Sequence, residues 1–215
     1  MNMSRLLIIA AGAAGISAAT AAVSDNIGSL GATDQHEIDV TTDRGTLRIT
    51  PLTDNIFKVT VIPEQLRSER FLPSKAVVLT PESNNVSLTA FPDSLTIASP
   101  TTSLTVDRMT GRITFRDSLG RVLLSEAAGL DNRGPVKTIS FIPGKGQNFF
   151  GAGERGHSLR LNGDTLPMYN RQNYGYTGSD PRIRQMNITM PWLVSDRGYG
   201  ILVDDHNKAE MVVAD

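Results

Sequence analysis

Short segments in which apolar and β-branched residues alternate with polar ones recur along the chain from residue 38 onward. Alternation with a period of two places successive side chains on opposite faces of a strand, so each segment predicts a strand with one buried face. Prolines, glycines and Asn or Asp residues separate the segments and supply turns. The strands predicted in this way cover residues 38–42, 45–50, 55–62, 76–80, 86–90, 94–98, 103–106, 113–115, 122–124, 186–194, 199–203 and 209–213.

Residues 103–125 show this pattern most clearly. Leu104 and Val106 alternate with polar residues, a Met-Thr-Gly turn follows, and Ile113 and Phe115 alternate again, which predicts a β-meander. Outside the N-terminal segment, no stretch of about 12 residues keeps the i, i+3, i+4 apolar spacing of a helix. Short strands spaced by roughly 8 to 12 residues therefore predict an all-β fold, an antiparallel two-sheet β-sandwich.

The N-terminal segment has a different pattern. Arg5 precedes an apolar run, and the small residues at positions 19–21 fit a signal-peptidase cleavage site. The run is too short to span the ~30 Å of a bilayer's hydrocarbon core, which argues against a membrane anchor. We expect residues 1–22 to be a signal peptide, residues 23–37 a polar connector and residues 38–215 the sandwich of an exported protein, periplasmic or extracellular.

Composition narrows the possible partners and chemistry. Lys and Arg number 21 against 22 Asp and Glu, for a net charge of −1, so no basic field favours nucleic acid or an anionic membrane surface. The absence of cysteine excludes disulfides, thiolate nucleophiles and zinc–thiolate sites. The sequence predicts no nucleic-acid partner, no membrane partner and no cofactor, and stability must come from packing.

Residues 148–173 lack both the strand and the helix period and are rich in Gly, Arg, Glu, His, Asn and Tyr, which is typical of a ligand-facing loop. The run from Gly151 to Gly156 matches G-x-G-x-x-G, but a dinucleotide site would need a helix directly after it. Residues 157–164 contain Asn-Gly-Asp and do not favour a long helix. We therefore interpret the glycines as positions of positive φ and of close approach to a neighbouring strand or ligand.

The charged residues of this loop allow two interpretations. Glu154, Arg155 and His157 could be a catalytic carboxylate, its electrostatic partner and a proton shuttle. Alternatively, Glu154 and Arg155 brace the loop by ion pairing and His157 caps a turn. Adjacent residues rarely converge on one reacting atom, which favours the bracing interpretation. Asp204-Asp205-His206 is typical of a solvated hairpin turn, so no metal ligand is assigned.

Residues 168–176 combine three tyrosines with amide and guanidinium donors. Planar rings beside such donors suit the hydroxyl arrays and apolar faces of sugars. An ordinary loop whose tyrosines pack onto the sandwich explains the same composition, and the two interpretations stay open at this point. Trp192 follows Pro191 within an apolar segment and is expected in the core.

Residues 102–115, 149–155, 169–171 and 197–202 together resemble the N-terminal β-sandwich of glycoside hydrolase family 31, in both order and spacing. That family contains α-glucosidases, α-xylosidases and α-transglucosylases. The resemblance implies a galactose-mutarotase-like sandwich over residues 38–215. It also implies a catalytic (β/α)8 barrel after the sandwich, so we expect the chain to be truncated and the natural polypeptide to continue beyond Asp215.

The resemblance further implies which domain holds the catalytic residues and which contributes to substrate binding. The two aspartates of the family's retaining mechanism lie on the barrel, so no residue of this chain is assigned a catalytic role. The sandwich lends a loop to the mouth of the barrel, and residues 169–172 match that loop. Arg171 and Gln172 are the first candidates for substrate binding, followed by Asn173 and Tyr174. Many relatives carry Asp where this chain has Gln172, which exchanges a charged acceptor for a neutral amide.

Three functions follow as hypotheses. The first is the non-catalytic N-terminal portion of an exported α-glucosidase or 4-α-glucosyltransferase, whose partners are an α-linked oligosaccharide and the barrel of the same polypeptide. The second is a sandwich that binds carbohydrate on its own. The third is an aldose-1-epimerase-like enzyme, which needs a carboxylate base and a histidine acid. His36, His157 and His206 are the histidines of the chain, and only His157 lies in the predicted loop.

Overall fold

A computed structural model describes residues 5–10, 37–42, 45–63, 74–81, 85–131, 136–172, 179–184, 187–205 and 207–213. Strands dominate these residues, and the one helical element among them is a short 3₁₀ helix. No helix in the described residues is long and apolar enough to cross a membrane. The elements are β1 (Arg5–Ala10), β2 (Ile38–Thr42), β3 (Gly45–Thr53), β4 (Ile56–Ile62), β5 (Ser87–Ala90), β6 (Ser94–Ala98), β7 (Thr102–Asp107), β8 (Ile113–Asp117), β9 (Val122–Ser125), β10 (Phe149–Gly153), β11 (Thr165–Met168), η2 (Pro181–Arg184), β12 (Thr189–Ser195), β13 (Tyr199–Asp204) and β14 (Ala209–Val212).

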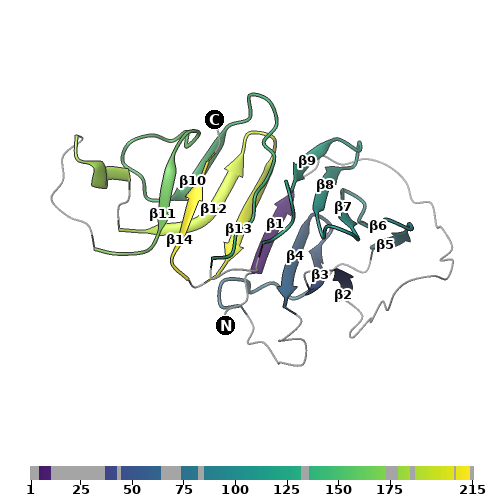
Figure 1. The fold of residues 1–215 in the computed structure, drawn as a ribbon. Coiled ribbons are helices and arrows are strands. Elements are labelled where there is room, and N and C mark those ends of the chain that lie inside the picture. The colour runs from purple at the N-terminus through teal and green to yellow at the C-terminus, as the bar shows by residue number, and fades with distance from the viewer. Residues whose placement is uncertain are drawn as a thin grey trace.

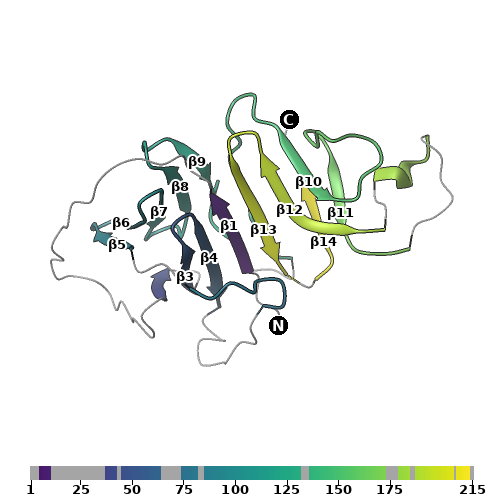
Figure 2. The same ribbon diagram turned by 180° about the vertical axis from the view of Figure 1, so that it is seen from behind.

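The described strands form three sheets. Within each sheet, all neighbouring strands pair in antiparallel fashion. A seven-stranded sheet has the order β10-β12-β13-β1-β4-β3-β2. A five-stranded meander, β5-β6-β7-β8-β9, lies beside its β2–β4 end, and the pair β11-β14 lies at the opposite end (Figures 1 and 2). The all-β antiparallel sandwich predicted from the sequence is confirmed, with the small third sheet as an addition.

One hydrophobic core joins all three sheets. At its centre, Phe57 of β4 faces Phe115 of β8 with ring centroids 6.2 Å apart and planes tilted by 60°, an edge-to-face type of contact between the two larger sheets. The same cluster continues through Ile201 of β13 to Leu166 of β11. Both smaller sheets therefore cover the same face of the seven-stranded sheet.

Most predicted strands are confirmed, several to within one or two residues, and β2 and β6 have the predicted bounds. The strand predicted at residues 76–80 is wrong. The Ser74 hydroxyl accepts the N–H groups of Ala76 and Val77 at 3.1 and 3.0 Å, a local bond that competes with strand pairing. Val78 is 87% exposed, so this apolar residue gains no burial from a sheet.

Two strands were missed inside the segment predicted as a loop, β10 and β11. In β10 the ladder to β12 shifts register between Gly151 and Gly153, which hides the two-residue period. In β11, Pro167 argues against a strand, yet it is tolerated because the β11–β14 ladder has only two strands. Within residues 148–172, the loop prediction made for residues 148–173 is thus corrected to two strands with loops after each.

The irregular part of β10 depends on positive φ angles at three successive residues, 110° at Gly151, 61° at Ala152 and 87° at Gly153. A Cβ at Gly153 would lie 2.4 Å from the carbonyl oxygen of Ile188. A Cβ at Gly151 would lie 2.6 Å from that of Trp192. Both glycines therefore allow β12 to approach closely, as expected, and no helix follows them in residues 154–164.

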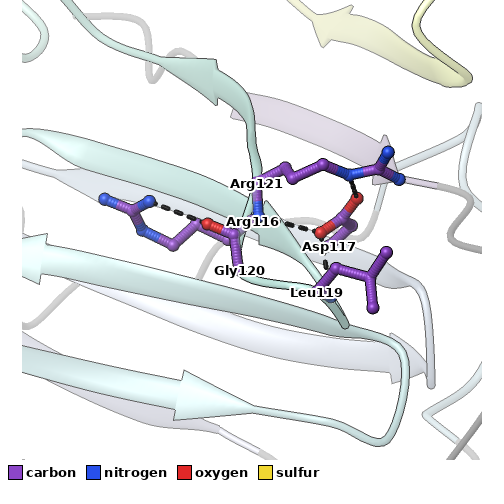
Figure 3. A network of polar contacts seen from close by, with 5 residues as sticks. All are labelled: Arg116, Asp117, Leu119, Gly120 and Arg121. Carbon is purple, nitrogen blue, oxygen red and sulfur yellow. Dashed lines mark hydrogen bonds and ion pairs between the residues drawn. The ribbon is translucent and has the colours of Figure 1, made fainter.

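A second fixed turn joins β8 to β9 (Figure 3). The buried carboxylate of Asp117 accepts the backbone N–H groups of Leu119 and Arg121 at 3.0 and 2.9 Å and Nε of Arg121 at 2.7 Å. Burial raises the pKa of Asp117, but the bonds from Arg121 and Leu119 outweigh it, and the net pKa is lowered. The charged carboxylate thus holds the turn.

We expect Gly153→Ala to destabilise the protein by about 3 kcal/mol or more, because the new Cβ meets the β12 backbone as well as an unfavourable φ. Gly146→Ala is the matched control, since Gly146 also has positive φ (67°) but has open space where a Cβ would lie. That control should cost only about 1 kcal/mol. Urea unfolding measures both, and equal losses would show that the approach of β12 is not the constraint.

Stability should also fall in acid through Asp117. Because its folded pKa is lowered, its contribution is complete above the unfolded pKa of about 3.9 and is lost as pH falls through the folded pKa. Urea unfolding of wild type and Asp117→Asn should therefore differ most near neutral pH and converge in strong acid. A difference that stays constant with pH would contradict the role of the charge.

Candidate functional site

Three segments converge beside the start of β12, and we call residues 154–164, 169–172 and 181–184 together the loop surface. The backbone N–H of Glu154 donates to the carbonyl of Ile188 at 2.8 Å, and that of Gly156 donates to Ile183 at 3.0 Å. Asn170 Oδ1 accepts the backbone N–H of Thr189 at 2.5 Å. In Figures 1 and 2, η2 and β11 lie at the end of the molecule opposite to β5 and β6.

Arg155 connects the β10 irregularity to η2. Its Nε and Nη2 donate to the carbonyl oxygen of Ala152 at 3.1 and 2.8 Å, and its Nη1 donates to that of Arg184 at 2.6 Å. Burial lowers the pKa of Arg155, and the charge of Asp164 partly opposes this. Glu154 is exposed and forms no ion pair with Arg155 or any other described residue. Arg155 thus braces the loop through backbone carbonyls rather than through the ion pair that the sequence suggested.

His157 and Asp164 form a second brace. His157 Nε2 lies 2.6 Å from Asp164 Oδ2, and Arg184 Nη1 lies 3.4 Å from Asp164 Oδ1. Asp164 is only 8% exposed, and its carbonyl accepts the N–H of Val213 at 2.9 Å. The other ring nitrogen of His157, Nδ1, is buried with no hydrogen-bond partner among the described residues. Nδ1 is thus buried and Nε2 is engaged by Asp164, whereas an epimerase-like acid needs a ring nitrogen that reaches the substrate.

Arg171 and Gln172 lie just beyond the end of β11, and residues 169–172 are all exposed. Asn170 fixes this segment to β12, as described above. Lys208 Nζ lies 5.7 Å from the ring centroid of Tyr169, within cation–π range. Arg171 forms no hydrogen bond or ion pair with any described residue, so its guanidinium donors face solvent. Asn173 and Tyr174 lie outside the described residues.

An exposed apolar surface lies next to this segment, on the side of the seven-stranded sheet away from the core. We call Phe150, Met190, Trp192 and Val194 the outer apolar patch. Phe150 and Val194 are register partners, and the other two alternate along β12 with Val194. Trp192 is half-buried, and its ring covers Gly200, where a Cβ would lie 2.5 Å from Cη2. The core position expected for Trp192 is therefore wrong.

The turn after β13 has its own internal bonds. Asp205 Oδ1 accepts the backbone N–H of Asn207 at 2.9 Å and its side-chain Nδ2 at 2.5 Å. His206 lies outside the described residues. In the part of the chain that the structure describes, no three His, Asp or Glu side chains gather as they would around a metal ion.

Comparison with known proteins places the fold. Among solved structures, the chain resembles the glycoside hydrolase family 31 dextranase of Flavobacterium johnsoniae in complex with glucose (TM-score 0.69, 18% identity, 81% of this chain and 22% of that one). It also resembles the family 31 α-xylosidase of Xanthomonas citri (0.62, 20%, 82% and 19%). A third is the cycloalternan-forming enzyme of Listeria monocytogenes in complex with a pentasaccharide substrate (0.62, 12%, 96% and 21%).

At these identities the likeness establishes the fold alone, and the chain spans about a fifth of the length of each of these proteins. No curated protein matches the chain. The profile of one family, described as the glycosyl hydrolase 31 N-terminal galactose mutarotase-like domain, matches residues 46–211. That match runs from β3 to β14 and takes in β10, β11 and the loop surface. The chain therefore belongs to the glycosyl hydrolase 31 N-terminal galactose mutarotase-like domain family.

Proposed function

We propose that this chain is the non-catalytic N-terminal portion of an exported α-glucosidase or 4-α-glucosyltransferase that acts on α-linked oligosaccharides. It contributes residues 169–172 to the sugar subsites of a (β/α)8 barrel in the same polypeptide. The observation that carries the proposal is the exposed guanidinium of Arg171, which has no partner among the described residues, on an anchored segment of a family 31 sandwich. The proposal also rests on length, since the chain spans about a fifth of similar enzymes.

The chemistry of residues 169–172 suits a sugar. The planar guanidinium of Arg171 offers donors to two neighbouring hydroxyls at once, and the ring of Tyr169 offers a face to sugar C–H groups. The bond from Asn170 to β12 holds both in place, which reduces the entropy lost on binding. Gln172 adds a neutral amide where many family members carry Asp, so we expect it to influence which acceptor is preferred.

The aspartates of the loop surface and its border already have structural partners. Asp164 pairs with His157 and Arg184. Asp180, next to η2, pairs with Arg182 at 2.5 Å, and hydrogen bonds from Arg182 lower its pKa to about 2. A glycosidase acid needs a raised pKa in order to hold its proton near neutrality. This electrostatic setting supports the proposal that the bond-breaking carboxylates lie on the barrel.

The outer apolar patch supports the presence of a covering domain. Exposed apolar residues that cluster on one sheet face mark a surface for interaction. The patch lies on β10 and β12. The first residue of β12, Thr189, also anchors Asn170. A barrel that covers the patch would bring its mouth close to Arg171. Export follows in this proposal from residues 1–22, which we interpret as a signal peptide.

The 215-residue chain should show no hydrolysis of an aryl α-glucoside, because it lacks the barrel's carboxylates. A polypeptide extended by its barrel-encoding region should hydrolyse or transfer glucose from the same substrate. Turnover by the 215-residue chain would refute the proposal. Calorimetric titration of that chain with maltooligosaccharides is the control, since binding much tighter than millimolar would indicate a carbohydrate-binding sandwich that works alone.

In the barrel-containing polypeptide, Arg171→Ala should raise KM for an α-linked oligosaccharide by about tenfold or more, since a charged hydrogen bond contributes about 1.5–3 kcal/mol. Arg116→Ala is the matched control, because Arg116 is an exposed arginine of the five-stranded sheet. Steady-state kinetics on both variants tests the assignment. An unchanged KM in Arg171→Ala would remove Arg171 from the subsites, and Gln172→Asp would then be the next variant for acceptor preference.

A further inference from the structure

The segment Arg5–Ala10 occupies the middle of the seven-stranded sheet, between β4 and β13 (Figure 1). It is antiparallel to both neighbours, with register pairs from Arg5↔Asp204 to Ala10↔Tyr199 on one side and from Arg5↔Thr60 to Ile9↔Ile56 on the other. Its residues from Leu6 onward belong to the apolar run of the expected signal peptide. One segment therefore has two incompatible fates, cleavage on export or retention as a central strand.

Removal of this segment would leave a slot between β4 and β13. Both edges of the slot would carry backbone N–H and C=O groups without partners, at the centre of the sheet rather than at its border. The slot also lies over the core, because Phe57 and Val59 on one side and Ile201 on the other belong to the hydrophobic cluster. An empty slot would expose this cluster to water, so a strand must fill it or the two edges must close on each other.

The family match and the length of the similar solved proteins bear on where that strand comes from. The match begins at residue 46, so it contains β4 and β13 but not β1. The matched residues therefore include both edges of the slot but not the N-terminal segment that fills it. This chain covers only about a fifth of each similar solved protein, and the remainder offers polypeptide that can supply one.

We propose that the space between β4 and β13 is an acceptor slot for a strand from the polypeptide that follows residue 215, and that Arg5–Ala10 fills it only until the leader is removed. This inference rests on the proposed function, which places a barrel-containing region after the sandwich. The incoming strand has about the six-residue length of β1 and contains no proline at a pairing position. It carries apolar residues at two positions, because these rows border the core. One position lies between Phe57 and Ile201, and the other lies between Val59 and Val203.

A chain that begins at Val23 tests the slot, with a synthetic peptide of residues 3–12 as the probe. We expect the peptide to bind, or to restore cooperative unfolding if the shortened chain does not fold alone. The same peptide with Ile8→Pro is the control and should bind at least about tenfold more weakly, because proline removes a ladder hydrogen bond. A shortened chain that is stable without the peptide and does not bind it would overturn the proposal, as would one that the peptide fails to restore.

A cross-link tests occupancy in the unprocessed 215-residue chain, which has no natural cysteine. Leu7→Cys with Leu202→Cys joins register partners, whereas Leu7→Cys with Val203→Cys is offset by one residue and places the two thiols on opposite faces. Oxidation should join the first pair in most molecules and the second pair in few. Equal yields would show that Arg5–Ala10 does not hold this register.

The occupant is tested in the barrel-containing polypeptide after removal of residues 1–22. The peptide of residues 3–12 should not bind there, because the natural strand fills the slot. Binding would overturn the assignment of the occupant. Hydrolysis of an aryl α-glucoside by the same sample reports on the proposed function separately, so an active enzyme that still binds the peptide would refute only the slot inference.

Discussion

The contact between the seven-stranded and five-stranded sheets, centred on Phe57 and Phe115, is the constraint on which the rest of the structure depends. It fixes which face of the seven-stranded sheet is the inner one. The core continues along that face to Leu166, so the β11–β14 pair must lie on it as well. The opposite face at β10 and β12 is left without a layer among the described residues, and the outer apolar patch lies there. The position of the loop surface follows from the same arrangement. With β11 on the core, the residues after it lie beside the start of β12, where Asn170 bonds Thr189.

Two-residue alternation predicted most of this fold because one face of each strand is buried in the sandwich. The pattern failed where another local force decided the backbone. Ser74 bonds to the next N–H groups and residues 76–80 form no strand. Positive φ angles at Ala152 and its neighbours interrupt the two-residue alternation, so β10 was not predicted. The apolar run that begins at Leu6 fits a leader and a strand equally well, since both accommodate consecutive apolar residues, so the pairing of β1 with β4 and β13 was not predicted.

The candidate site was predictable in residue type but not in pairing. The family resemblance pointed to Arg171 and Gln172, in a segment whose composition left two interpretations open, and the structure shows both residues exposed just beyond the end of β11. The partners of Arg155 and His157 could not be inferred, because they depend on contacts between distant segments. Arg155 bonds the carbonyl of Arg184, 29 residues away, and His157 bonds Asp164 across a turn. The sequence suggested Glu154 as the partner of Arg155, yet backbone carbonyls accept the bonds of Arg155, and the side-chain carboxylate of Asp164 is the partner of His157.

The two surfaces that the proposals assign to the rest of the polypeptide meet on β13. Its Gly200 lies beneath Trp192 of the outer apolar patch, and the same residue borders the acceptor slot as the partner of Ile9. Successive residues of a strand in the slot point to opposite faces. Its inward residues would complete the core between Phe57 and Ile201, and its outward residues would lie in the rows of Gly200 and Leu202, next to Trp192. Filling the slot would therefore extend the outer apolar patch, so that the strand completing the sandwich would also enlarge the surface that the barrel covers.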